Sequence, residues 1–434
     1  MTLLRPMAAL LASAEFARAY TLTALAAAFA SFMIERLTST TTMVTIFALL
    51  ALVGAGMLVA RREELSLLRF APTSLLGFLT LAIVSVLWSG NKPHTVLGWL
   101  ALLGMATIAI TIGHVRDTLQ TVRAIGDTLR WLLCISLGLE ILAGILLDMP
   151  LTLFGIEGNL ALGGPIQGIF GTRNLLGFMA VVALITFVIE WRTQSVSRVV
   201  GVLSVALGGF LALLSASPTV VVLAAAVGVT TVALTIVRHA PPARRALVQW
   251  LLGAAVVAGL VLAFARRHQI IQLLDAGSDF STRADLWNAI LDWVSEKPVT
   301  GYGWFGPWTG GEYPFQYINF QLSNHHQSAL NSYFDVLLQL GVLGLALFLV
   351  LGGVATVRSW LVASVRRSVV YAWTPLLLVT LAVESMFESF TLVGAGWLLL
   401  VLCALRAGQT RSWRQNIDDA HTGTLPTLGP QSQG

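Results

Sequence analysis

Charged residues are scarce in this chain of 434 residues: together they make up 11%, where a soluble protein has about a quarter. Hydrophobic residues make up 56%, and the mean hydropathy is +0.80. We therefore predict an integral membrane protein. The hydrophobic runs have the length of helices and not of short alternating strands, so we expect an all-α protein and not a barrel.

Cysteines and nucleotide-binding motifs are also few or missing. Cys134 and Cys403 lie far apart in apolar runs, so we expect two free, buried thiols. The sequence has no phosphate-binding loop, no dinucleotide fingerprint, no nucleophile elbow and no Asp-rich metal motif. A transferase with this sequence therefore needs a substrate that is already activated.

About twelve apolar runs have a length near that needed to cross a bilayer. They lie at roughly 17–34, 41–60, 71–88, 95–113, 127–147, 174–190, 199–215, 217–237, 246–265, 332–357, 370–388 and 391–406. The first run begins either as a span or as an interfacial helix. Ser215-Ala216-Ser217-Pro218 forms either a tight hairpin or a break in one helix, and only Glu388-Ser389-Phe390 separates the last two runs.

These runs divide the chain into four parts. Residues 1–265 are expected to carry nine spans, and residues 266–331 to form a large loop with amphipathic helices between the ninth and tenth spans. Residues 332–406 carry the last three spans. Residues 407–434 are polar and are expected to form a disordered cytoplasmic tail.

Lys and Arg set the orientation of the spans. If the N-terminus is cytoplasmic and the spans alternate, 19 of the 26 basic residues lie on the cytoplasmic side, as the positive-inside rule predicts. Both termini are then cytoplasmic, and residues 266–331 face a periplasm-like compartment. The net charge of +5 is explained by the cytoplasmic loops, so we do not expect a nucleic acid partner.

The seven basic residues left on the outer side stand where positive charge is disfavoured. They are Arg36, Lys92, Arg173, Arg266, Arg267, Arg283 and Lys297. Four of them, namely Arg173, Arg266, Arg267 and Arg283, either pair with lipid headgroups or nearby acids, or form an anion site. Arg173 and Asn174 stand at the start of a span, where free backbone N–H groups also favour anions. Arginine suits phosphate because its guanidinium makes two parallel hydrogen bonds.

The large outer loop concentrates polar and aromatic side chains. Arg283, Trp287 and Ile290 recur at helical spacing, which predicts an amphipathic helix over residues 282–294. Gly301-Tyr302-Gly303-Trp304 predicts a turn with aromatic rings at the headgroup level, where they could also stack on sugars.

His325 and His326 follow Asn324 just before the next span, and they are either structural or catalytic. Zinc is a weaker interpretation, because no cysteine accompanies the pair. The carboxylates within spans, Glu140, Asp335, Glu384 and Glu388, are expected to face the bundle interior or an aqueous cleft, since each is costly in lipid.

Four motifs resemble those of the O-antigen ligase and polymerase superfamily of bacterial envelope polysaccharide assembly. They are Leu87-Trp88-Ser89 with Asn91-Lys92-Pro93; Gly171-Thr172-Arg173-Asn174; Arg283-Ala284-Asp285-Leu286-Trp287 followed by Gly301-Tyr302-Gly303; and Asn331-Ser332-Tyr333-Phe334-Asp335. The sequence departs from the family at Leu330, where His is frequent, and at Pro218, where Arg is frequent. His326 would share a face with residue 330 if the segment were helical.

The resemblance implies a glycosyltransferase of the helical membrane type (C-type), in the bacterial inner membrane, with its site on the periplasmic face. Its donor would be a glycan on undecaprenyl diphosphate and its acceptor a sugar hydroxyl of lipid A–core, without metal or other cofactor. Arg173, Arg283, Arg267 and Asn174 would bind the diphosphate, and His326 or His325 would accept the hydroxyl proton. A polymerase of lipid-linked repeat units and a flippase for lipid-linked glycans are the alternatives.

The topology predicts where reporter fusions become active. A periplasm-dependent reporter joined near Gly310 should be active and one joined after Arg245 inactive, because the charge bias places the two residues on opposite sides. Alkaline phosphatase and fluorescent-protein fusions at both sites measure this. A cytoplasmic signal near Gly310 would contradict the topology.

Overall fold

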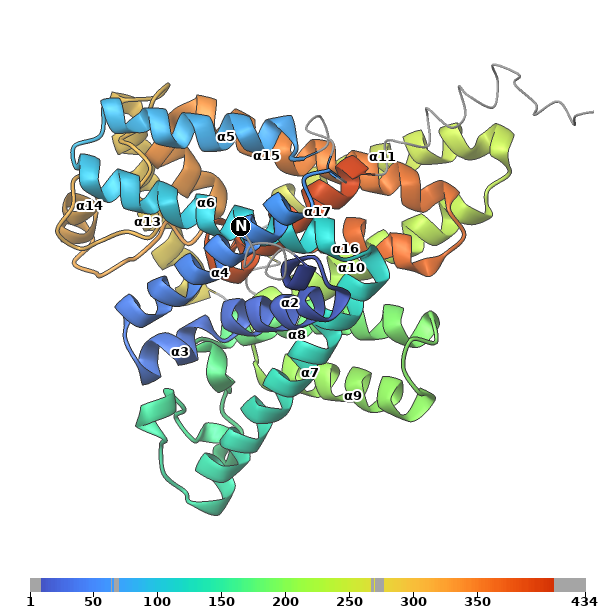
Figure 1. The fold of residues 1–434 in the computed structure, drawn as a ribbon. Coiled ribbons are helices and arrows are strands. Elements are labelled where there is room, and N and C mark those ends of the chain that lie inside the picture. The colour runs from blue at the N-terminus through green and yellow to red at the C-terminus, as the bar shows by residue number, and fades with distance from the viewer. Residues whose placement is uncertain (1–8, 64, 66–69, 267–268, 270–276, 410–434) are drawn as a thin grey trace, which may run out of the picture.

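The computed structural model describes residues 9–63, 65, 70–266, 269 and 277–409, and within them the chain is helical without a β-strand. Figure 1 shows the helices packed together and crossing at various angles. The helices of the first part are α2 (Ala14–Phe29), α3 (Ser31–Leu37), α4 (Thr40–Ala60), α5 (Thr73–Val84), α6 (Lys92–Val115), α7 (Thr118–Ile141), α8 (Arg173–Arg192), α9 (Arg198–Leu214), α10 (Pro218–His239) and α11 (Pro242–Ala265). The others are α13 (Gly277–Glu296), α14 (Phe315–Gln321), α15 (Ser332–Val365), α16 (Trp373–Glu384) and α17 (Gly394–Gln409).

Each of the twelve predicted apolar runs overlaps a helix of the structure. In the part of the chain that the structure describes, six helices are long and apolar enough to cross a membrane, or seven if α2 and α3 form one span bent by 73°. The protein is thus a multi-pass membrane protein, and the number of twelve spans stays a prediction. The bend at Ala30 belongs to the first run. Residues Ser215–Ser217 separate two helices, α9 and α10, and Ala216 between them has a φ of 45°.

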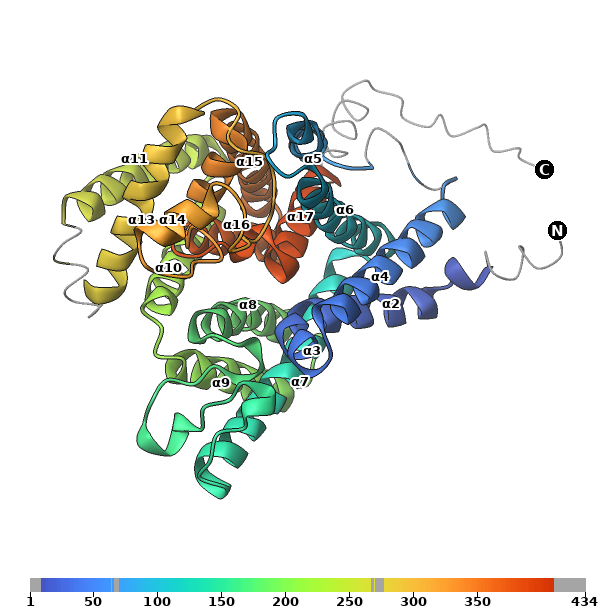
Figure 2. The ribbon, with the colours of Figure 1, turned by 90° about the vertical axis from the view of Figure 1, so that its left-hand side faces the viewer.

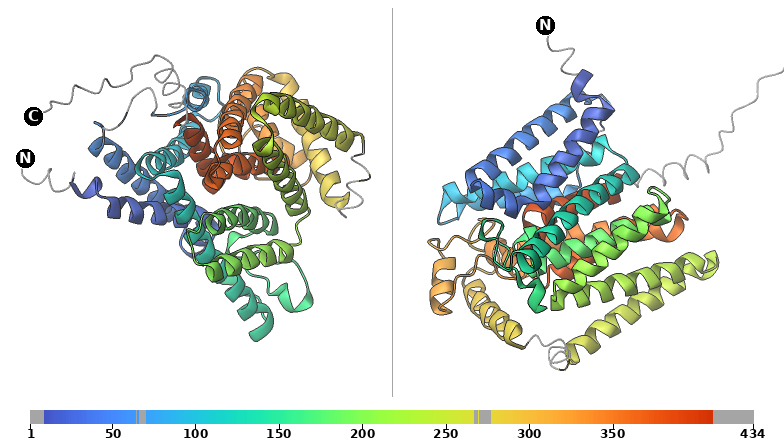
Figure 3. Two further views of the ribbon diagram at one scale, coloured as in Figure 1. Left: turned by 90° about the vertical axis from the view of Figure 1, so that its right-hand side faces the viewer. Right: turned by 90° about the horizontal axis from the view of Figure 1, so that it is seen from below.

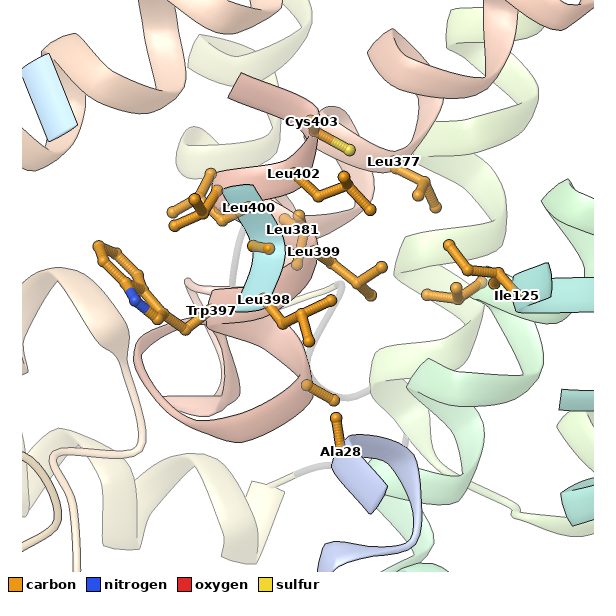
Figure 4. Packing of buried hydrophobic residues seen from close by; sticks show 14 of the residues in the cluster. Ala28, Ile125, Leu377, Leu381, Trp397, Leu398, Leu399, Leu400, Leu402 and Cys403 are labelled. Atoms are coloured by element: carbon orange, nitrogen blue, oxygen red, sulfur yellow. The ribbon is translucent and has the colours of Figure 1, made fainter. Parts of the chain in front are cut away.

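The core of the bundle surrounds α17. This helix is buried along almost its whole length. In Figure 4 Leu398, Leu399 and Leu402 point toward the side of Leu377 in α16, whereas Trp397 points the other way, where its Nε1 donates to the Leu102 carbonyl of α6 (3.1 Å). Many apolar side chains of α4, α10 and α11 point outward instead, as expected for helices that face lipid. Cys403 is buried as predicted, but Cys134 is exposed, because it lies on an outward face of α7 beside Trp131 and Ile135.

Residues 277–331 cover one end of the bundle. Figures 1 and 2 place α13 and α14 together at this end, and Figure 3 shows the turn between α10 and α11 at the opposite end. The described part of this segment has its own apolar core, which includes Leu286, Ile290, Phe305, Trp308 and Phe315. The predicted amphipathic helix is confirmed, but it starts earlier, at Gly277.

The turn at Gly301–Trp304 lies inside the protein. Tyr302 and Trp304 are buried, so the expectation that they face headgroups or sugars is wrong. Trp304 packs edge-on against Phe78 of α5, and its backbone N–H donates to Ser85 Oγ (3.0 Å). The motif before α6 has the matching contact, in which Trp88 Nε1 donates to the Thr300 carbonyl (3.1 Å).

The turn at Gly301–Trp304 packs against a kink in α15. Gly341 has φ 65° and ψ −166°, which no helical residue has, and the kink leaves carbonyls of the preceding turn without a helical partner. Tyr302 N donates to the Leu338 carbonyl (3.1 Å), and Gly303 N donates to the Gln339 carbonyl (2.8 Å). Backbone of the loop therefore completes the hydrogen bonding of the span.

We expect Gly341→Ala to loosen this junction. The positive φ alone costs about 1–3 kcal/mol for a residue with a side chain. A Cβ would also lie 2.2 Å from the Val299 carbonyl oxygen, which is backbone and cannot rotate away. Gly352→Ala is the matched control, because it lies in the same helix and its Cβ would meet no atom within 4 Å.

Thermal unfolding of the detergent-purified variants, followed by tryptophan fluorescence, measures the difference. The Tm of Gly341→Ala should fall by several degrees while that of Gly352→Ala stays equal or rises slightly. Equal Tm values for the two variants would contradict the proposed junction.

Candidate active site

The start of α8 is fixed by the residues before it. Gly171 has a φ of 84°, and a Cβ there would lie 2.5 Å from the Phe32 ring, so the position requires glycine. Thr172 caps the helix, since its Oγ1 accepts from Leu175 N (3.1 Å). Arg173 and Asn174 are then the first two helical residues, where backbone N–H groups have no partner within the helix. Arg173 and Asn174 therefore begin the helix as predicted, and anion binding at this position stays a prediction.

Glu140 holds the glycine-rich loop that leads to α8. This buried carboxylate of α7 accepts hydrogen bonds from Gly168 N (2.8 Å) and Gln167 N (3.2 Å). The hydroxyl of Ser136, one turn earlier, accepts from Ile169 N (3.3 Å). Glu140 faces the interior as predicted, and its role is to fix the loop backbone ahead of Arg173.

Glu388 joins three elements at the end of α16. Its Oε1 accepts hydrogen bonds from Arg283 Nη2 of α13 (2.8 Å) and from Asn174 Nδ2 of α8 (2.6 Å). Asn174 Oδ1 accepts in turn from Ser217 Oγ at the start of α10 (2.7 Å). Because Glu388 is 5% exposed, removing one partner would leave a charge or a polar group unpaired in a nearly dry environment.

Arg283 uses part of its guanidinium to hold the loop. Nη1 donates to the carbonyls of Leu330 (3.1 Å) and Phe387, while Nη2 binds Glu388. An arginine has five N–H donors. No described residue accepts from Nε or from the second N–H of Nη2, so two donors stay available on a side chain that is 13% exposed.

The histidine segment is an irregular loop and not a helix. Asn319 of α14 clamps the backbone of His326: its Oδ1 accepts from His326 N (2.9 Å), and its Nδ2 donates to the His326 carbonyl (3.0 Å). The helical register expected to bring His326 to the face of Leu330 is therefore wrong. Helical hydrogen bonding is prevented because Asn319 takes the N–H of His326 and Asp335 that of Ala329.

Asp335 anchors the end of this loop. The buried carboxylate accepts from Trp308 Nε1 (2.6 Å), from Ala329 N (3.0 Å) and from the Ser389 hydroxyl. Trp308 stacks on Phe315 of α14 at 4.8 Å between ring centroids. One carboxylate thus joins α14, the histidine loop, α15 and the segment after α16.

The predicted site residues meet at one cavity. A cavity of about 720 Å³ is lined by Arg173, Asn174, Arg283, His325 and His326. Its other lining residues are Glu157, Pro165, Ile166, Gln167, Gly171, Thr172, Thr282, Gln327, Ser328, Leu330, Glu388 and Phe390. Arg267, the remaining candidate, lies outside the described residues. Residues 410–434 of the predicted tail also lie outside them.

Electrostatics favour a neutral imidazole at His326. The side chain is half-buried, which lowers the pKa of His326 because the charged form loses hydration. The positive charge of Arg283 lowers the pKa further. A neutral imidazole can accept a proton, so the arrangement places a base beside cationic groups. Within the described chain, no group of three or more His, Cys, Asp and Glu side chains is arranged to hold a metal ion.

Comparison with known families finds a match to one part of the chain. The model of the O-antigen ligase family matches residues 202–349. This segment is similar to the O-antigen ligase family. The resemblance predicted from the motifs is therefore confirmed for this segment, and the ligases and polymerases of the family are glycosyltransferase-like enzymes. No curated protein matches the chain.

The matched segment contains only part of the candidate site. It runs from α9 into α15 and includes Ser217, Arg283, His326 and Asp335. Arg173 and Glu388 lie before and after it, and only the fold brings them to the cavity. Asn319 was missed by sequence reasoning, because its amide acts on the backbone of a residue seven positions away and belongs to no motif.

The lowered pKa of His326 can be tested directly. We expect a pKa below 6.5 in the wild-type protein and a higher one in Arg283→Met, because that variant loses a nearby positive charge. NMR titration of histidine-labelled protein measures both values, with His326→Gln used to identify the signal. An unchanged pKa in Arg283→Met would show that Arg283 does not act on His326.

Proposed function

We propose that this protein is an O-antigen ligase, which transfers a glycan from undecaprenyl diphosphate to a sugar hydroxyl of lipid A–core. The observation that carries the proposal is the single cavity that collects Arg173, Arg283 and the histidine pair from separate parts of the chain. The family match supports a lipid-linked glycan as substrate.

The donor diphosphate would bind between α8 and α13. The first turn of α8 has backbone N–H groups without a partner within the helix, Arg173 adds a charge, and Arg283 offers the two N–H donors that Leu330, Phe387 and Glu388 leave. These groups would stabilise the negative charge that develops on the leaving diphosphate as the glycosidic bond breaks. Replacing Arg173 or Arg283 with lysine should preserve only part of the diphosphate binding, since an ammonium cannot make the bidentate contact.

His326 would then act as the general base. The acceptor oxygen attacks the anomeric carbon and the new C–O bond forms as the bond to the phosphate oxygen breaks. The bonding electrons leave with undecaprenyl diphosphate, and the hydroxyl proton passes to the neutral imidazole. One direct displacement inverts the anomeric centre. This reaction uses neither a nucleotide nor a metal ion.

The location follows from the substrate and the charge bias. The cavity lies at the end of the bundle where α8, α10 and α15 begin, which the topology predicts to be the periplasmic side of the bacterial inner membrane. Both termini would be cytoplasmic, and the partners would be the lipid-linked glycan, lipid A–core and membrane lipids.

Reconstitution tests the activity. Purified protein in liposomes with the lipid-linked glycan and lipid A–core should give glycosylated lipid A–core without added nucleotide or metal. A lengthened lipid-linked glycan as the product would identify a polymerase instead. Movement of the donor across the bilayer without a new glycosidic bond would identify a flippase.

The histidine variants test the mechanism. His326→Ala should slow single-turnover transfer by about 10²–10⁴-fold, the usual contribution of a positioned general base. It should still bind undecaprenyl diphosphate, since binding is assigned to the arginines. His325→Ala is the matched control and should be milder, because its side chain is exposed. A wild-type rate in His326→Ala would remove it as the base, and a wild-type rate in both would point to Glu388, the nearly buried carboxylate that lines the cavity.

A further inference from the structure

The negative charge of Glu388 disfavours an anion in the same cavity, so its presence there needs a separate explanation, such as a ligand that the carboxylate itself binds. Among the described residues that line the cavity, only Glu157 and Glu388 are acidic. Glu157 is exposed and accepts from Asn159 Nδ2 (2.7 Å), so water can screen its charge. Glu388 is nearly buried, beside the two arginines assigned to the diphosphate, where its charge opposes that of the donor.

The two oxygens of Glu388 have different surroundings. Oε1 accepts hydrogen bonds from both Arg283 and Asn174, which offset the charge and fix the carboxylate plane. No described residue donates to Oε2, and it is not among the buried side-chain atoms that lack a partner. Glu384, one helical turn earlier, is the contrast: both its oxygens are buried without a partner, and it does not line the cavity.

An ionised carboxylate oxygen can only accept hydrogen bonds. An ionised diphosphate has no hydrogen to donate, so Oε2 cannot bind the charged part of the donor. A ligand of Oε2 must carry O–H or N–H groups and reach the space beside the diphosphate. Sugar hydroxyls meet both conditions, and they stand on each side of the reacting bond.

We propose that Glu388 is a sugar-binding residue, whose Oε2 accepts a hydrogen bond from a hydroxyl adjacent to the reacting centre. The proposal rests on the glycosyltransferase function above and adds a specificity determinant to it. The hydroxyl is not the attacking one, whose single proton goes to His326. It belongs either to the acceptor sugar or to the first sugar of the donor.

Glu388→Gln is the decisive variant. Gln keeps the shape and an oxygen that can accept from Arg283 and Asn174, but it replaces Oε2 by an NH₂ group that donates. Binding of undecaprenyl diphosphate, which carries no sugar, should be unchanged or tighter because a negative charge is lost. A step that involves the sugar should weaken by about 10–100-fold, the factor expected for a lost hydrogen bond to a charged group.

Two measurements tell the sources of the hydroxyl apart. A raised KM for lipid A–core with unchanged donor affinity assigns the hydroxyl to the acceptor. Weaker binding of the glycan-bearing donor relative to bare undecaprenyl diphosphate assigns it to the donor. The binding measurements need no transfer, so they report on Glu388 even where the proposed reaction itself fails.

Glu384→Gln is the matched control, with the same chemical change one turn away and outside the cavity lining, and it should leave every one of these quantities unchanged. Glu388→Asp, which keeps a carboxylate, should lose less sugar-dependent affinity than Glu388→Gln and serves if Glu388→Gln fails to fold. The proposal is overturned if Glu388→Gln weakens bare undecaprenyl diphosphate as much as the sugar-bearing ligands. The same holds if it changes neither, or if Glu384→Gln has an equal effect.

Discussion

The hydrogen bonds to the Glu388 carboxylate hold the candidate site together. Arg283 approaches from the loop segment and Asn174 from α8, and both donate to one oxygen of a nearly buried group. A charge in such a place is costly unless it is paired, so the pair fixes where α13 sits relative to α8. The shape of the cavity between these helices depends on that fixed distance, and so does the position of the guanidinium donors that Glu388 leaves free.

A second carboxylate supports the first without touching the cavity. Asp335 binds Trp308, Ala329 and Ser389, and Ser389 directly follows Glu388 in the chain. The Ser389 hydroxyl accepts from Asn331 N (3.3 Å), and Ser332 donates to the Glu388 carbonyl through N–H (3.2 Å) and Oγ (3.0 Å). The start of α15 and the end of α16 are therefore joined. The histidine loop is fixed on one side by Asn319 and on the other by Asp335.

Much of the architecture could be predicted from the sequence, because hydrophobic length is a strong and local signal. Every predicted run overlaps a helix, and Thr172 caps α8 where the glycine motif indicated. The scarcity of charge also made Arg173 and Arg283 conspicuous on the outer side, and both line the cavity. What the runs do not give is the number that cross a bilayer, since helices such as α5 and α16 are short.

The failures have a common cause, namely contacts between residues distant in sequence. The helical register around His326 assumed that local backbone bonds dominate, whereas Asn319 and Asp335 take those N–H groups. Tyr302 and Trp304 resembled interfacial aromatics. The backbone of this turn instead donates hydrogen bonds to carbonyls of α15 just before the kink at Gly341, and both rings are buried. The role of Glu388 could not be chosen from the sequence, because its partners lie 105 and 214 positions away.

These long-range partners also order events during biosynthesis. Asn174 is made early, Arg283 later, and Glu388 and Ser389 only after α16 has been synthesised. A nascent chain that ends within α15 already carries both arginines and the histidine pair, yet Arg283 lacks its carboxylate and Asp335 lacks the Ser389 hydroxyl. The cavity can therefore close only when the ribosome has nearly finished the chain, and the incomplete protein has no formed site to offer a lipid-linked substrate.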